Sequence, residues 1–176
     1  MSANGKVIGF RPKKFLGQNF LVDKNLQEKI VRACEIASQD TILEIGGGRG
    51  EITKLIAKET DKMAVLEIDS SLFPVLKDNL AGYPKIRILH RSILGFNIAR
   101  FFKGDFKIKV IGNLPYNITT PIIVHLLKFR DKIGGIFITV QKEFAQRMVA
   151  LPGTPDWSAF SCFLQFYVNP EILFFY

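Results

Sequence analysis

The stretch Thr41-Ile42-Leu43-Glu44-Ile45-Gly46-Gly47-Gly48-Arg49-Gly50 decides the fold class. Its first five residues form a short, mostly apolar run, which predicts a buried strand, and the glycines that follow predict a tight turn. The next stretch, residues 51–58, repeats apolar side chains at helical spacing. A strand, a glycine turn and a helix in this order are the opening unit of an α/β fold.

The same alternation continues toward the C-terminus. A pattern of strands separated by helices predicts a doubly wound, mostly parallel sheet of the Rossmann-like type, with helices on both faces. Pro121 suits the first turn of one of these helices. We expect further strands at 63–68, 86–89, 107–111 and 136–140, and helices at 70–80, from Pro121 to about Arg130, and through Phe144 and Met148.

The two ends of the chain differ from this core. Residues 1–22 are basic and rich in turn formers, which predicts an arm, and Asp23 is a good N-cap for a helix carrying Leu26, Ile30 and Val31. We expect residues 23–176 to form the α/β domain. Residues 172–176 have the character of a sixth strand with no polar tail behind it, so we expect the natural protein to continue and this fold to lack its C-terminal end.

Composition narrows the class of protein. A chain of 176 residues with 48% hydrophobic and 23% charged residues is typical of one globular domain. Its apolar runs are shorter than the ~20 residues of a membrane-spanning helix, so we expect no membrane association. The formal net charge of +8 favours a polyanionic partner, and nucleic acid before an anionic membrane.

Cysteine and histidine are scarce. Cys34 and Cys162 form no CxxC pair, which argues against a disulfide framework and favours a reducing compartment such as the cytoplasm. His90 and His125 are too few and too far apart to indicate a metal centre, and we expect them to be surface or packed histidines without a catalytic role.

Parallel sheets bind ligands beyond the carboxyl ends of their strands, and the glycine cluster 46–50 lies at such an end. Glycines permit positive φ and close backbone approach, so a nucleotide-like ligand could lie against this turn and the helix that follows. The alternative is a tight turn with no ligand. Glu51 stands where the last glycine of the GxGxxG pattern of dinucleotide enzymes would be.

Two acids follow the second predicted strand. Glu67 lies about 20 residues beyond the glycine turn, where an acid can accept hydrogens from the ribose hydroxyls of a nucleoside. Asp69 could compete for that role or could cap the helix that starts near Ser70. We favour Glu67 as the ribose acceptor and Asp69 as the cap.

The end of the fourth predicted strand carries Asn113-Leu114-Pro115-Tyr116. The Asn113 side-chain carbonyl and the Leu114 backbone carbonyl could accept hydrogens from a planar exocyclic amine, and Pro115 would stiffen the turn. Tyr116 offers a flat face for stacking on a base. The alternative is an ordinary turn with a core tyrosine.

A further candidate, Gln18-Asn19-Phe20-Leu21, precedes all of these. Such a loop could fold over a cofactor as a lid. Phe20 and Leu21 could equally form a hydrophobic staple for the first helix, which is the interpretation that the pattern alone favours.

Four ordered motifs carry a family resemblance. Residues 15–21 (FLGQNFL), 44–50 (EIGGGRG), 113–117 (NLPYN) and 141–143 (QKE) resemble the ribosomal RNA adenine dimethyltransferases, whose members methylate adenines in small-subunit rRNA. The resemblance runs from about Arg11 to the last residue. It implies a class I S-adenosylmethionine-dependent methyltransferase fold, with S-adenosyl-L-methionine as the cofactor.

The resemblance also implies roles for individual residues. Asn19 and Leu21 become a cofactor lid, which reverses the interpretation from pattern alone, Glu67 holds the ribose, and Tyr116 stacks on a flipped-out adenine. The implied catalytic residues are Asn113, Leu114, Pro115 and Tyr116, and the implied cofactor-binding residues are Asn19, Leu21, Gly46, Gly48, Glu67, Ser92 and Asn113.

Three features depart from the family pattern. Family members usually show Gly-Pro-Gly-Leu-Gly at 46–50, so Arg49 adds a cation near the cofactor turn. Ser92 stands where they usually carry an Asp that contacts the cofactor adenine, which predicts weaker cofactor binding. The sequence also stops before the family's Phe-x-Pro-x-Pro-Lys-Val segment, which supplies the last antiparallel strand, and before its small helical C-terminal domain.

The expected function is dimethylation of adenine N6 in small-subunit rRNA, with the immature small ribosomal subunit as partner and a monomer as the acting form. We expect Arg11, Lys13 and Lys14 to contact RNA phosphates, and further basic clusters to bind phosphate or to lie at solvated element ends. The alternatives are a non-catalytic RNA-binding ribosome-assembly or transcription factor on the same fold, and an NAD-dependent oxidoreductase, which leaves Asn113–Tyr116 unexplained.

Overall fold

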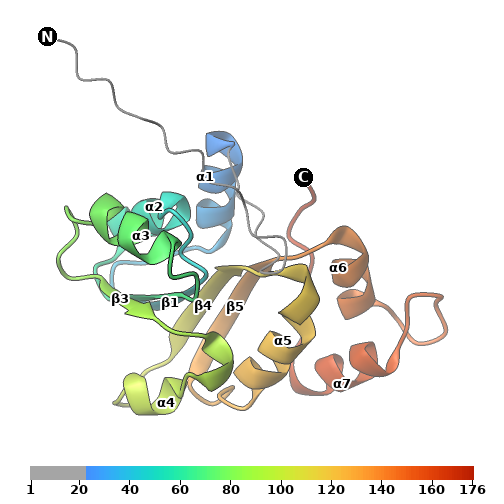
Figure 1. Ribbon diagram of the computed structural model, residues 1–176. Coiled ribbons are helices and arrows are strands. Elements are labelled where there is room, and N and C mark those ends of the chain that lie inside the picture. The colour runs from blue at the N-terminus through green and yellow to red at the C-terminus, as the bar shows by residue number, and fades with distance from the viewer. Residues whose placement is uncertain (1–22) are drawn as a thin grey trace, which may run out of the picture.

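The computed structural model describes residues 23–176, and a parallel sheet forms their centre (Figure 1). The sheet has five strands in the order β3-β2-β1-β4-β5, and every neighbouring pair is parallel. The predicted Rossmann-like sheet is therefore confirmed. The strands are β1 (Thr41–Ile45), β2 (Met63–Glu67), β3 (Arg87–His90), β4 (Ile108–Asn113) and β5 (Ile133–Thr139).

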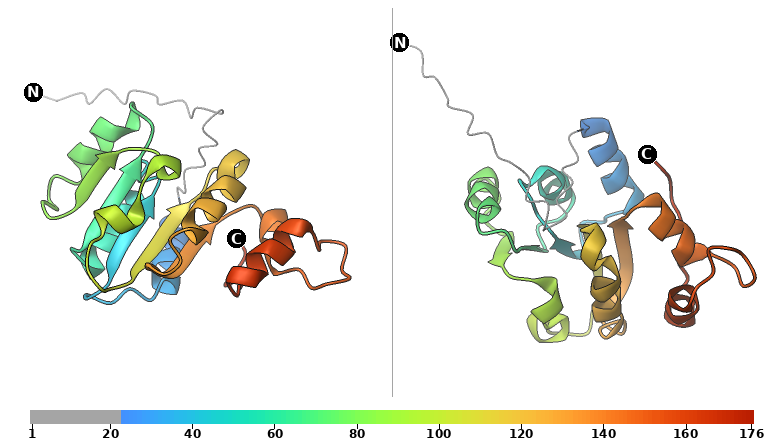
Figure 2. Two further views of the ribbon diagram at one scale, coloured as in Figure 1. Left: turned by 90° about the horizontal axis from the view of Figure 1, so that it is seen from below. Right: turned by 45° about the vertical axis from the view of Figure 1, so that its right-hand side comes forward.

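Helices cover both faces of the sheet (Figure 2). One face packs against α1 (Lys24–Ala33), α2 (Glu51–Glu59) and α3 (Leu72–Asn79), and the other against α4 (Ile98–Phe101) and α5 (Thr119–Leu127). Beside β5 lie α6 (Lys142–Val149) and α7 (Ala159–Tyr167). None of the helices within residues 23–176 has the length and apolar character needed to span a bilayer.

The alternation of side chains along β1 explains this layering. Ile42 and Leu43 are both fully buried, but successive side chains in a strand point to opposite faces. Ile42 packs with Val31 and Ile56 of α1 and α2, whereas Leu43 packs with Ile122 of α5. A strand that is buried on both faces has the continuous apolar run seen in the sequence.

Side-chain caps fix two helix starts. The Asp23 carboxylate accepts from the Asn25 backbone N–H at 2.8 Å, so the predicted N-cap of α1 is confirmed. At α7, Ser158 and Ser161 form a reciprocal capping box. The Ser161 hydroxyl also donates to the Arg147 carbonyl oxygen at 2.6 Å, which ties α7 to α6.

The prediction of a sixth strand at residues 172–176 was wrong. This segment has no strand structure, and β5 is the last strand in the order of the sheet. An extended segment becomes a strand only when a neighbour completes its hydrogen-bond ladder, and residues 172–176 have no such ladder. Two of their side chains contact helices instead: the Lys29 ammonium of α1 lies 4.1 Å from the centre of the Phe174 ring, and the Lys142 ammonium of α6 lies 5.5 Å from that of Phe175.

Candidate active site

A large open cavity lies at the carboxyl ends of the strands, where ligands bind to parallel sheets. Its volume is about 1030 Å³, and it continues along β5 toward the C-terminal segment 169–176. The turns after β1, β2, β3 and β4 all contribute to its wall. The predicted site residues that line this one cavity are Gly46, Gly48, Glu67, Ser92, Asn113, Pro115 and Tyr116.

The glycine turn between β1 and α2 needs its glycines for two different reasons. Gly46, Gly48 and Gly50 have φ of +79°, +57° and +87°, a region that side chains disfavour. Gly47 instead needs space, because a Cβ there would lie 2.5 Å from Cγ1 of Val65. Gly50 is the N-cap residue of α2 and makes no side-chain hydrogen bond to the helix. The positive end of the helix dipole is therefore not covered by a side-chain oxygen of its own cap residue.

Glu67 is the last residue of β2 and holds the turn from the other side. One carboxylate oxygen accepts from the Gly48 backbone N–H at 2.8 Å, and the other accepts from the Asp69 N–H at 2.7 Å. Burial raises the pKa of Glu67, while these two hydrogen bonds act to lower it. A backbone hydrogen bond from Ile68 also lowers this pKa, so three of the about four lone-pair sites of the carboxylate have donors and one remains for another donor.

Asp69 serves the start of α3. Its Oδ1 accepts from the Ser71 backbone N–H at 2.9 Å and from the Ser71 hydroxyl at 2.6 Å, directly before the helix begins. The N-cap of α3 is Ser71, which makes no side-chain cap hydrogen bond, so Asp69 holds the turn before the helix and is not its N-cap as predicted. Glu67 lines the cavity and Asp69 does not.

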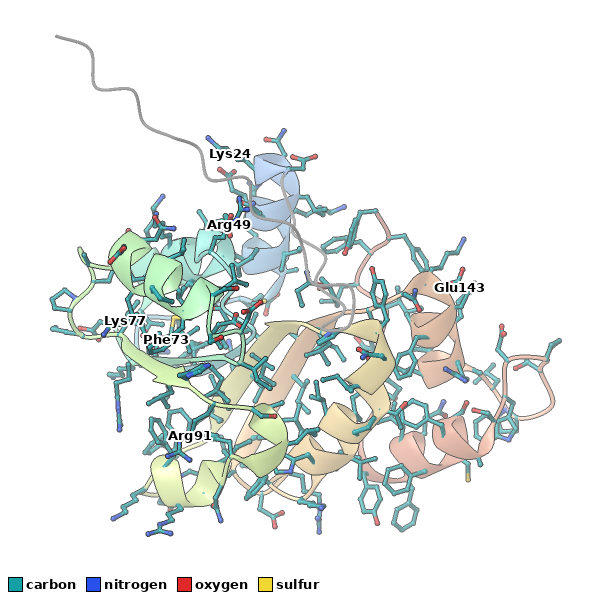
Figure 3. The ribbon with its side chains drawn as sticks, in the orientation of Figure 1. Lys24, Arg49, Phe73, Lys77, Arg91 and Glu143 are labelled. Atoms are coloured by element: carbon teal, nitrogen blue, oxygen red, sulfur yellow. The ribbon has the colours of Figure 1, made fainter. Side chains whose placement is uncertain are left out.

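Ser92 follows β3 and lines the cavity beside Arg91. Its hydroxyl oxygen accepts from the Leu94 N–H at 3.3 Å, so it also caps a short 3-10 helix at Ile93–Gly95. Arg49, by contrast, is not among the residues that line the cavity. In Figure 3, Arg49 lies at the start of α2 and Glu143 at the start of α6, on opposite sides of the strand ends.

Asn113 is the last residue of β4, beside the end of β5. The Thr139 hydroxyl donates to Asn113 Oδ1 at 2.6 Å, and the Thr139 carbonyl oxygen accepts from the Leu114 N–H at 3.2 Å. The Leu114 side chain is buried in the core, and Leu114 is not among the residues that line the cavity, although both of its neighbours, Asn113 and Pro115, are.

Tyr116 begins a short 3-10 helix at Tyr116–Ile118 and is 43% exposed. Tyr116 is therefore not a core tyrosine, and its role in stacking on a base stays a prediction. Pro115 holds the turn below it, with φ −65°, and its carbonyl oxygen accepts from the Thr119 hydroxyl at 2.9 Å.

Two residues of the cavity region were missed by sequence reasoning. Thr139 looked like an ordinary strand residue. Glu44 stood inside an otherwise apolar strand, a signal that could have identified it. Glu44 is 3% exposed, and burial raises its pKa to about 8. The nearby Thr53 hydroxyl lowers that pKa without making a hydrogen bond of normal geometry, and Glu44 Oε2 has no partner in the structure.

Other candidates do not belong to the cavity. The imidazoles of His90 and His125 are within hydrogen-bond distance of backbone carbonyl oxygens, at 3.1 Å from Ile68 and 3.0 Å from Phe96. Among the further basic clusters, one was predicted at Lys103, Lys107 and Lys109, and its Lys109 forms an ion pair with Asp40 at 2.8 Å and so supports the fold. In residues 23–176, no group of three His, Cys, Asp or Glu residues could hold a metal ion.

Five predicted residues lie outside the described part of the chain. They are the cofactor-lid residues Asn19 and Leu21 and the RNA-contact residues Arg11, Lys13 and Lys14.

Comparison with known proteins finds relatives among the ribosomal RNA methyltransferases. The family model "Ribosomal RNA adenine dimethylase" matches residues 9–174. A protein of Alkaliphilus metalliredigens named "Ribosomal RNA small subunit methyltransferase A" is 42% identical over 167 residues, 93% of this chain and 58% of that protein. The protein of the same name from Shouchella clausii is 44% identical over 94% of this chain and 57% of its own length. The chain thus spans somewhat more than half the length of these relatives.

Solved structures show the same architecture. A dimethyladenosine transferase from Plasmodium falciparum matches with a TM-score of 0.70 and 28% identity, over 81% of this chain and 50% of that one. The 23S rRNA methyltransferase ErmE matches with a TM-score of 0.70 and 26% identity, over 81% of this chain and 55% of that one. The fold is that of the class I S-adenosylmethionine-dependent methyltransferases.

Proposed function

Because the chain belongs to the ribosomal RNA adenine dimethylase family, we propose that it dimethylates adenine N6 in small-subunit ribosomal RNA during ribosome biogenesis. S-adenosyl-L-methionine is the proposed methyl donor. One observation carries the proposal: the glycine turn, Glu67 and the Asn113–Tyr116 turn come from three different strand ends and line a single cavity. A nucleoside cofactor and a planar base need such a shared space.

The residues around the glycine turn fit the cofactor. The turn has no side chains at Gly46 and Gly48, which permits close approach, and the N-terminus of α2 lies directly behind it. Glu67 is held in place by two backbone N–H groups and keeps a lone-pair site for a ribose hydroxyl. When bound, the cofactor supplies a methyl group on a sulfonium, which is a good leaving group.

The turn after β4 fits the target base. The Asn113 side-chain oxygen and the Leu114 backbone oxygen would accept hydrogens from N6 and stabilise the positive charge that develops on it. Tyr116 would stack on the adenine ring, a contact of about 1–3 kcal/mol. Positioning supplies much of the acceleration. No strong base is needed, because a methylated aminium is acidic enough to lose its proton to water.

The proposed partner is the immature small ribosomal subunit, which the net charge of +8 would attract. In this proposal the protein acts as a monomer in the cytoplasm. Its two cysteines are both free thiols, which agrees with a reducing compartment. Arg11, Lys13 and Lys14 would contact RNA phosphates, and Asn19 and Leu21 would cover the cofactor.

A non-catalytic assembly or transcription factor on the same fold is the second candidate. The observation that favours it is Ser92, which offers one neutral hydroxyl in place of a carboxylate and already uses its oxygen to cap a short helix. Weak or absent cofactor binding would follow if this position dominated the cofactor's affinity.

Titration calorimetry separates these candidates. We expect binding of S-adenosylmethionine and no binding of NAD. Glu67→Gln should weaken binding about 10-fold, because an amide replaces one acceptor oxygen and loses charge-assisted hydrogen bonds. Glu59→Gln, at an exposed position of α2, is the matched control and should bind normally. Absence of cofactor binding would favour the assembly factor, and NAD binding would favour the oxidoreductase.

A further inference from the structure

The hydroxyl of Thr139 contacts the amide on which the proposed reaction depends. Thr139 is the last residue of β5 and is paired with Asn113, the last residue of β4. Its Oγ1 donates to Asn113 Oδ1 at 2.6 Å, which is short for a neutral hydrogen bond. Its carbonyl oxygen also holds the Leu114 N–H at 3.2 Å. One threonine thus contacts both residues that would receive the target amine.

The orientation of the Asn113 carboxamide decides what it offers to a ligand. Its oxygen accepts hydrogen bonds and its NH₂ donates them, although the two groups have nearly the same shape. An amine that is about to be methylated presents hydrogens, so it needs the oxygen. A carboxamide turned by half a rotation would present N–H groups to N–H groups and repel the substrate.

Tyr176 lies close to the same hydroxyl. Burial raises the pKa of the Tyr176 phenol, with a further contribution from Tyr116, whereas the Thr139 hydroxyl lowers it. The single hydrogen of the Thr139 hydroxyl is donated to Asn113 Oδ1.

We propose that Thr139 is a positioning residue that fixes the Asn113 carboxamide with its oxygen directed at Thr139 Oγ1, the orientation in which the carboxamide presents its acceptor. This inference rests on the proposed function. It assigns Thr139 no contact with the reacting atoms, because its hydroxyl acts through Asn113. The expected consequence is a larger effect on the rate of methyl transfer than on cofactor affinity.

Valine is the decisive substitution, because it keeps the shape of threonine and removes only the hydroxyl. The backbone link from residue 139 to Leu114 survives in Thr139→Val. We expect kcat for methyl transfer to fall about 5–20-fold, with a change of about 2-fold or less in the KM for S-adenosylmethionine. Thr139→Ser retains a hydroxyl and should recover most of the rate. Thr154→Val, at an exposed loop threonine, is the matched control and should not change kcat.

A second readout does not depend on activity. The side-chain amide signals of Asn113 in a ¹⁵N correlation spectrum can be assigned by their absence from Asn113→Ala. In Thr139→Val these signals should shift or broaden, because the carboxamide gains a second orientation, whereas Thr139→Ser should preserve them. Thr139→Ala replaces the valine variant if the latter does not fold.

The two readouts separate the failure of this inference from failure of the proposed function. Unchanged Asn113 signals in the hydroxyl-free variants, or an unchanged kcat, would overturn the role of Thr139. A wild-type protein that transfers no methyl group would overturn the proposed function, and the amide signals would still decide whether Thr139 holds Asn113. A serine variant as impaired as the valine variant would assign the effect to packing and contradict the inference.

Discussion

Glu44 is the second-last residue of β1 and Glu67 is the last residue of the neighbouring strand β2, and burial raises the pKa of both. The negative charge of a nearby acid raises each pKa further. Glu67 acts on the pKa of Glu44, and Asp69 acts on the pKa of Glu67. Two buried carboxyls beside a cavity that would receive a cationic cofactor make the cofactor-free protein sensitive to pH. Cationic charge in the cavity would favour their ionised forms.

Substitution of Glu44 tests how far ionisation of this buried carboxyl lowers the stability of the cofactor-free protein. The pKa of Glu44 rises from 4.5 to about 8 on folding, so its contribution to stability is complete below pH 4.5 and is lost as the pH rises toward about 8. Each pH unit in that window costs up to about 1.4 kcal/mol. Glu44→Gln, which resembles the protonated acid, should be the more stable protein at about pH 9 and should equal the wild type near pH 4.

Urea unfolding of the cofactor-free protein across this window provides the measurement. Glu59→Gln, an exposed acid of α2, should leave the pH dependence of the wild type unchanged. A Glu44→Gln protein with the same pH dependence as the wild type would show that Glu44 ionises at its ordinary pKa.

Gly47 offers a steric prediction at the same scale. In Gly47→Ala the new Cβ would lie 2.5 Å from Val65 Cγ1 and 2.8 Å from Leu76 Cδ2, and both neighbours are fully buried. We expect the free energy of unfolding to fall by about 1–3 kcal/mol. Gly82→Ala is the control, because a Cβ there meets nothing within 4 Å. Equal stability of the two variants would contradict the packing of the turn.

At the scale of elements, the capping box of α7 should contribute measurably to stability. Ser158→Ala removes the side-chain acceptor for the Ser161 N–H, and we expect a loss of about 1 kcal/mol in thermal or urea unfolding. Ser70→Ala, at an exposed serine of a turn, is the control. A loss as small as that of the control would mean that α7 is fixed by packing alone.

The sequence predicted the elements whose signals are local. The apolar runs of β1 and β2 and the Asp23 cap of α1 each lie within one element, and the structure confirms them. Strand β5 begins at Ile133, whereas the sequence predicted a start at residue 136. The prediction was late because Gly134 and Gly135 are unfavourable in strands and interrupt the apolar pattern. Helix α7 was not predicted, because its many aromatic residues are typical of strands as well as of buried helices.

The sixth strand shows the limit of such local signals. Residues 172–176 have the composition of a strand, but a ladder depends on a partner elsewhere in the chain. Two side chains of this segment instead contact helices, Phe174 at Lys29 and Phe175 at Lys142. Composition cannot distinguish these two outcomes.

At the scale of the whole molecule, topology made the site predictable. Parallel strands place all their carboxyl ends at one edge, so motifs far apart in the sequence had to meet there. Glu67, Asn113 and Tyr116 were found in this way. Thr139 and Glu44 were not, because their importance depends on which neighbouring side chain they touch.

The net charge of +8 predicts the behaviour of the whole molecule toward RNA. Affinity for small-subunit RNA should fall about 10-fold or more between roughly 50 and 200 mM salt, because binding releases counterions. Lys14→Ala should reduce the slope of this dependence in filter binding or fluorescence anisotropy. Lys85→Ala, which removes an exposed lysine paired with Asp61, is the charge-matched control. An affinity that does not change with salt would contradict phosphate binding.

The central claim is that one cavity joins the methyl donor to the N6 amine held by Asn113. Its most direct test is transfer of labelled methyl from S-adenosylmethionine to under-methylated small ribosomal subunits, with the product nucleoside identified by mass spectrometry. We predict N6,N6-dimethyladenosine from the wild type and from the exposed control Asn25→Ala, and a loss of about 100-fold or more in Asn113→Ala. Methylation at another atom, or an Asn113→Ala protein as active as the wild type, would contradict the account.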